Sequence, residues 1–80
     1  MAGKKHAYNA EAVKKAADLC GSLAKLAIAV EAAYSSAFNW AHGKTAPRPL
    51  SCIKIEKATD GRVAREDIRP DFNWADYKQV

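Results

Sequence analysis

Apolar residues recur every three or four positions through the middle of the chain, from Leu23 to Ala41. This spacing places them on one face of a helix. The members of this face are Leu23, Leu26, Ala27, Val30, Ala33, Ala37, Trp40 and Ala41. No glycine or proline interrupts the segment. The pattern therefore allows either one helix of about twenty residues or two helices joined by a turn near residues 31–33.

The segments on either side also predict helices. Upstream, Asn9 is a good N-cap and Gly21 a natural stop, which predicts a helix over about residues 9–20. Its apolar stripe consists of Ala12, Val13, Ala16, Ala17, Leu19 and Cys20. Downstream, Pro49 suits the first turn of a helix that Gly61 closes. Its inward positions are Leu50, Ile53, Ile55 and Ala58. Residues 52–56 alternate between polar and apolar types, so a strand is the alternative there, and residues 65–68 predict a short helical turn.

Eighty residues are enough for one small domain, and these elements make it all-α with four or five helices. Residues 1–8 are expected to be a flexible basic arm, and residues 9–71 the folded domain. Residues 72–80 form a tail with Phe72, Trp74 and Tyr77, which we expect to pack on the core or in a dimer interface. No apolar run approaches the roughly 20 residues of a membrane span, and no secretory signal is present, so we expect a cytoplasmic protein.

The net charge of +4 is unevenly placed. Basic residues concentrate in residues 1–15 and 43–65, whereas residues 22–42 are neutral. A neutral centre between basic flanks is typical of a nucleic-acid binder, because the flanks hold phosphates while the centre contacts bases. A general contribution to solubility is the alternative explanation of the same charge.

The second half of the central segment contains the candidate functional residues. If the chain turns near Glu31, residues 34–42 form a second helix. Its outward side chains are Tyr34, Ser35, Ser36, Phe38, Asn39 and His42. Such side chains can meet base edges by hydrogen bonds or touch a thymine methyl group, whereas a solvated helix usually has Lys and Glu there. The segment then predicts a helix-turn-helix whose second helix lies in a DNA major groove.

Each candidate has an expected role. Base contacts are assigned to Tyr34, Ser35 and Phe38, with a phosphate or a plain surface position as the alternative for Tyr34 and core packing as the alternative for Phe38. Phosphate contacts are assigned to Ser22, Ser36, Asn39, His42, Lys44 and Arg48. Among these, Ser22 also caps the helix that follows it, Asn39 also suits an adenine edge, and His42 also suits a plain solvated position. Trp40 is expected in the core, and Lys4, Lys5 and His6 of the arm are candidates to follow DNA.

Other chemistry has little support in the sequence. Cys20, Cys52, His6 and His42 include no pair with the close spacing of zinc ligands, so no metal site is expected and both thiols are expected to be reduced core residues. No nucleophile, glycine-rich phosphate loop or paired acid stands out. We therefore expect neither an enzyme nor a bound cofactor.

A set of positions along the chain is similar to a known family. These positions are Leu26, Ala27, Asn39, Trp40, Gly43, Pro47, Ile55, Glu56, Lys57, Ala58, Thr59, Gly61, Val63 and the run from Arg65 to Asp71. They resemble the Cro-like regulators of phages and prophages and the YdaS-type group described as antitoxins, over about residues 21–71. The resemblance implies a small λ-repressor-like helix-turn-helix domain that binds double-stranded operator DNA, commonly as a homodimer. It also favours two central helices over one.

Three positions depart from the family's pattern. Glu31 stands in the turn where the family usually has Gly, a residue that adopts positive φ angles easily. Ala33 stands at the start of the second helix in place of a capping Ser or Thr. The base-contacting positions offer Tyr34, Ser35 and Phe38 where the family often has Gln, Asn or Arg.

Two functions follow from these patterns. The first is a sequence-specific transcriptional repressor that blocks a promoter by binding its operator. The second is a protein-binding antitoxin or antirepressor whose aromatic tail contacts a toxin or another protein. Binding that uses several phosphates weakens steeply with salt, whereas an apolar protein contact does not, so salt dependence separates the two.

Overall fold

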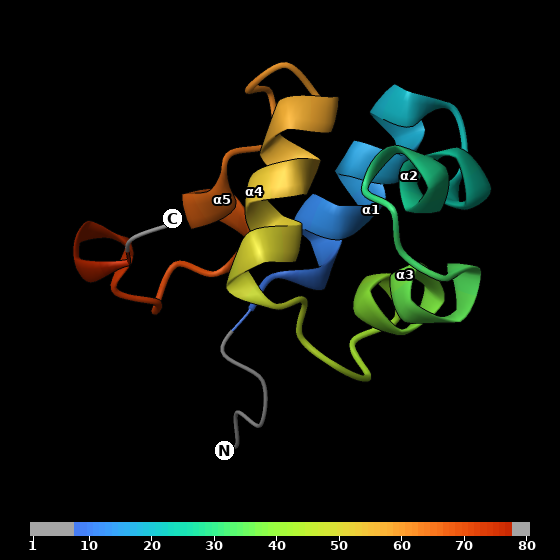
Figure 1. Ribbon diagram of the computed structural model, residues 1–80. Helices are drawn as coiled ribbons and strands as arrows, with labels where there is room; N and C mark the ends of the chain where they lie inside the picture. The colour runs from blue at the N-terminus through green and yellow to red at the C-terminus, as the bar shows by residue number, and fades with distance from the viewer. Residues whose placement is uncertain (1–7, 78–80) are drawn as a thin grey trace.

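The computed structural model describes residues 8–77, which are helical with no strand. Figure 1 shows the elements in order. They are α1 (Ala10–Cys20), α2 (Leu23–Ala29), α3 (Tyr34–Ala41), α4 (Pro49–Ala58), α5 (Arg65–Ile68) and a 3-10 turn, η1 (Trp74–Asp76). The all-α prediction is confirmed, including two helices in the central segment and a helix rather than a strand over residues 52–56. Lys4, Lys5 and His6 of the expected arm lie outside the described residues, as do residues 78–80 of the tail.

Short-range chemistry sets the helix boundaries as the sequence predicted. The Asn9 side chain accepts a hydrogen bond from the backbone N–H of Glu11 at 3.0 Å, which caps α1. Gly21 ends α1 at a φ of 114°, and Ser22 caps α2 by accepting the N–H of Lys25 at 3.1 Å. Pro49 occupies the first turn of α4, where its missing N–H costs nothing.

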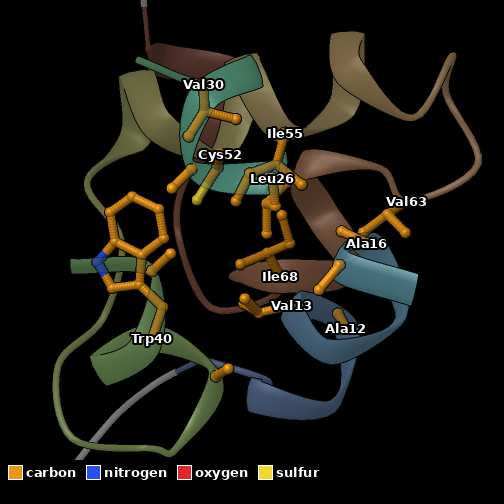
Figure 2. Packing of buried hydrophobic residues seen from close by; sticks show 14 residues of the cluster. Ala12, Val13, Ala16, Leu26, Val30, Trp40, Cys52, Ile55, Val63 and Ile68 are labelled. Carbon is orange, nitrogen blue, oxygen red and sulfur yellow. The ribbon is translucent and has the colours of Figure 1, made fainter. Parts of the chain in front are cut away.

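The core lies where α1, α2, α4 and α5 meet, and Figure 2 shows its centre. Leu26, Ile55, Ile68 and Val13 are fully buried there. Trp40 of α3 covers one side of this centre, and its side chain is only 7% exposed. Its predicted position in the core is confirmed. Because Trp40 and its neighbours Ala37 and Ala41 are the buried residues of α3, the other side of that helix faces outward.

Three apolar residues that periodicity placed inside lie at the surface. Leu19 is 41% exposed because it lies at the edge of the buried face of α1. Leu50 is 42% exposed because it lies opposite Cys52, which is the buried centre of the α4 face. Ala33 is exposed because it is the extended N-cap of α3, outside the helix, where a helical period does not apply.

Side-chain hydrogen bonds fix the connection between α4 and α5. The Thr59 hydroxyl donates to the Ile55 carbonyl at 3.0 Å and accepts the Val63 N–H at 3.1 Å. One carboxylate oxygen of Glu56 accepts both the backbone N–H of Arg65, at 3.0 Å, and its Nε–H, at 2.7 Å. Glu56 therefore caps the first turn of α5 from α4, which explains why so short a helix holds its place.

The aromatic tail, defined here as Phe72, Trp74 and Tyr77, folds into a small cluster. Its ring centroids are 4.5 to 5.8 Å apart. Trp74 packs against the core, and its indole N–H donates to the Arg69 carbonyl at 3.0 Å. In Figure 1 the tail and α3 lie on opposite sides of the molecule, with α4 between them. The molecule thus presents two separate surfaces, one at α3 and one at the tail.

Candidate nucleic-acid interface

The turn between α2 and α3 positions the candidate helix. Glu31 has a φ of 60°, the left-handed conformation for which the family's glycine is suited. Its N–H donates to the Ile28 carbonyl at 3.1 Å, and the N–H of Ala32 donates to the Ala27 carbonyl at 2.9 Å. This pair of bonds is a Schellman motif, which ends α2 and reverses the chain into α3. The tight turn forms even though its left-handed residue is glutamate.

The exposed side of α3 carries two stripes of side chains, because residues four apart lie above one another on a helix. We call Tyr34, Phe38 and His42 the aromatic stripe. Ser35 and Asn39 form a neighbouring polar stripe, and Ser36 lies beside it. Four of the predicted contacts, Tyr34, Ser35, Phe38 and Asn39, thus share one surface.

The aromatic stripe is a stacked array. The Phe38 and His42 rings are stacked with centroids 3.9 Å apart, and the Tyr34 ring is 6.3 Å from that of Phe38. The Lys44 ammonium lies 5.8 Å from the centre of the Phe38 ring. The stacking leaves Phe38 half-buried, whereas Tyr34 is 53% exposed. Phe38 is therefore neither a core residue nor a freely exposed ring.

Besides Ser36 and Asn39 on α3 itself, the predicted phosphate contacts fall into two groups. Ser22 and His42 line one shallow groove with Lys14 and Leu23, where α1 and α2 meet the end of α3. Lys44 and Arg48 are exposed in the segment between α3 and α4, and Lys44 alone contacts the aromatic stripe. The structure thus brings His42 and Lys44 to the same end of α3 and adds Lys14, which the sequence analysis did not single out.

Tyr8 belongs to the folded domain and not to the arm to which the sequence assigned it. It packs against the core, and its hydroxyl donates to the Trp40 carbonyl at 2.7 Å. Burial raises the pKa of the Tyr8 hydroxyl, and a backbone hydrogen bond at Gly43 opposes this shift. The signal in the sequence was an aromatic residue directly before the Asn9 cap. Tyr8 ties the start of the folded domain to the end of α3.

Charged residues lie before and after α3 in the chain, but the helix itself has no acidic or basic residue. Before it, the Glu31 carboxylate pairs with the Lys54 ammonium at 2.9 Å, and the hydrogen bond from Lys54 lowers the pKa of Glu31. After it come Lys44 and Arg48, neither of which is in an ion pair within the described residues. The pairing of Glu31 with Lys54 offsets a negative charge beside the candidate surface.

Other chemical sites find little support in residues 8–77. No group of three or more His, Cys, Asp or Glu residues there is placed to hold a metal ion. Burial raises the pKa of the Cys52 thiol to about 11, although the nearby Arg69 opposes this shift, so that thiol is protonated and unreactive near neutral pH. Cys20 is half-buried, and both cysteines are free. Across the described part of the chain, no helix has the length and apolar character needed to span a bilayer.

The order α1 to α5, with a tight turn between α2 and α3, defines a small all-α domain of the helix-turn-helix kind. The family described as Bacterial toxin YdaS matches residues 13–77. The chain belongs to this family, as the resemblance in its sequence had indicated. No curated protein and no solved structure matches the chain.

Proposed function

We propose that the protein is a sequence-specific DNA-binding regulator that represses a promoter by placing α3 in the major groove of its operator. The observation that carries this proposal is the exposed side of α3. It is uncharged and offers hydroxyl, amide and aromatic groups. It is followed by the cations Lys44 and Arg48, which form no ion pair within residues 8–77. This is the arrangement in which a neutral surface contacts bases while its basic borders contact phosphates.

In this proposal each residue has a distinct part. Tyr34, Ser35 and Phe38 contact bases, and Asn39 contacts a phosphate or the edge of an adenine. The other phosphate contacts come from Lys44 and Arg48 together with Ser22, Ser36 and His42. Two of these residues, Ser22 and His42, line one groove beside the end of α3, and Lys14 lines the same groove. A homodimer on a pseudo-palindromic operator completes the arrangement, and neither an enzymatic step nor a cofactor is required.

The test is fluorescence anisotropy with labelled duplex DNA from the region upstream of the protein's own gene, compared with scrambled duplex at about 50 and about 200 mM salt. A preference for the upstream duplex of about a hundredfold or more supports a specific regulator. Weak binding that ignores sequence and disappears with salt contradicts it.

Two substitutions assign the roles. Lys44→Ala should weaken binding to every duplex by a similar factor, because phosphates are the same in all sequences. Ser35→Ala should change the preference between duplexes. Arg62→Ala removes the same charge from the segment between α4 and α5 and should have little effect. Equal losses on upstream and scrambled DNA for both α3-side variants would contradict the assignment.

A second candidate is a protein-binding module, which the toxin description of the family favours. The aromatic tail would then contact a protein partner, and it lies on the opposite side of the molecule from α3. Tyr77→Ala should weaken such a complex and leave DNA binding by α3 unchanged, measured side by side by anisotropy. Binding to the partner should also respond little to salt, unlike binding to DNA.

A further inference from the structure

The side-chain types on α3 limit which bases it can recognise. Guanine is most often recognised by Arg or Lys, which donate two hydrogen bonds to its major-groove edge. Residues 34–41 include neither. What α3 offers instead is the amide of Asn39 and the aromatic stripe. An amide pairs well with the major-groove edge of adenine, and apolar groups contact the methyl group of thymine.

We infer that α3 recognises A·T base pairs, with Tyr34 and Phe38 contacting the methyl groups of thymine and Asn39 the edge of adenine. This inference rests on the proposed DNA-binding function and names the class of sequence that it selects. The thymine methyl group and the hydrogen-bonding edge of its paired adenine lie side by side in the major groove. The aromatic and polar stripes lie side by side on α3 in the same way.

The packing of the aromatic stripe suits contact with a methyl group. Stacking on His42 covers one face of the Phe38 ring, and the Lys44 ammonium lies 5.8 Å from its centre. One face of the Phe38 ring is therefore taken by His42, and the part of the side chain that stays accessible is apolar. The ring is also held in place before binding, so contact with DNA costs little conformational entropy. Tyr34, at the first turn of α3, is the more exposed of the two rings.

The magnitude of such contacts is measurable. Burying one methyl group is worth a factor of about four in affinity, so two contacts are worth roughly fifteenfold. Uracil differs from thymine by this methyl group alone and leaves the minor groove unchanged. The exchange of thymine for uracil keeps every hydrogen-bonding group of the base pair, so it separates contact with the methyl group from recognition by hydrogen bonds.

The experiment compares three duplexes of about 24 base pairs, roughly two turns of B-DNA, by anisotropy at low salt. The first contains A·T pairs only, the second has uracil in place of every thymine, and the third contains G·C pairs only. We expect the thymine duplex to bind roughly fifteenfold more tightly than the uracil duplex. The G·C duplex should bind no better than the uracil duplex. This comparison uses the unaltered protein, so it does not depend on a variant that folds.

Substitutions then test the residues. Tyr34→Ser should reduce the ratio of thymine to uracil affinity to about fourfold or less, whereas Leu19→Ser removes an exposed apolar side chain from α1 and should leave the ratio unchanged. Equal affinity for the thymine and uracil duplexes, or tighter binding to the G·C duplex, would overturn the inference while DNA binding itself stands. Failure to bind any of the three duplexes at low salt would overturn the proposed function as well.

Discussion

Glu31 has a left-handed backbone conformation, with a φ of 60°, which residues other than glycine adopt only at a cost in free energy. The bonds of the Schellman motif and the ion pair with Lys54 at 2.9 Å both help to keep it there. The neighbouring Ala32 packs against the core directly after the turn. At Glu31 the path of the chain depends on contacts rather than on the local preference of the residue.

Two substitutions at this position separate backbone strain from the loss of the ion pair. Glu31→Ala and Glu31→Gly both remove the carboxylate, but only glycine relieves the strain of a positive φ. We expect the Gly variant to melt about 5 °C above the Ala variant, followed by circular dichroism. Identical melting temperatures would mean that the turn is not strained.

The two thiols differ in their surroundings and should differ in reactivity. At a pKa of about 11, roughly one Cys52 thiol in a thousand is ionised at pH 8. We expect iodoacetamide to label the half-buried Cys20 in the native protein and Cys52 only after unfolding, as seen by mass spectrometry. Cys20→Ser should then abolish native labelling. Rapid double labelling of the folded protein would contradict the buried position of Cys52.

Among the elements, α5 depends most on its neighbours, since four residues do not form a stable helix alone. Glu56 of α4 caps it and pairs with the Arg65 side chain. The backbone N–H of Asn9 donates to the Ile68 carbonyl at 2.7 Å, which joins the start of α1 to the end of α5. The short helix α5 is therefore held at its start by α4 and at its end by the residue that precedes α1.

The pair formed by Glu56 and Arg65 should make stability depend on pH. The hydrogen bond from Arg65 lowers the pKa of Glu56 below its usual value of about 4.3. A lowered pKa contributes stability that is present above the unfolded value and is lost as the pH falls through the folded one. We expect the urea concentration at the unfolding midpoint to decrease once the pH is lowered below about 4.3. Glu56→Gln should lower the free energy of unfolding at pH 7 by about 1 kcal/mol.

The Gln variant also provides the check on this assignment. It should lose part of the acid-induced change in stability, whereas Glu66→Gln, an exposed carboxylate in α5, should retain it. An unchanged acid profile in the Glu56 variant would assign the pH dependence to other carboxylates.

On the scale of the whole molecule, the tail is part of the fold as well as a candidate surface. Trp74 packs against the core, and the Arg65 guanidinium lies 5.8 Å from its ring. Because Trp74 is half-buried, Trp74→Ala should cost about 2 kcal/mol, roughly half the loss at a fully buried Trp. Urea unfolding followed by circular dichroism measures this loss. An unchanged midpoint would mean that the tail packs too loosely to stabilise the domain.

The sequence by itself determined which segments are helical. Asn9, Gly21 and Pro49 act on the backbone within one turn, and apolar periodicity is a local property, so the ends of α1 and the start of α4 were predictable. Within the central segment, the residues alone allowed one helix or two, and the family resemblance decided for two. The outward position of Tyr34, Ser35 and Phe38 followed from the same local geometry.

The tertiary structure decided what depends on contacts between distant residues. Leu19 and Leu50 are exposed because no neighbouring element covers the sides of α1 and α4 on which they lie. Tyr8 joins the core because the end of α3 offers a carbonyl 32 residues away. Periodicity assigns a residue to a face of its own helix, but only packing determines what that face meets.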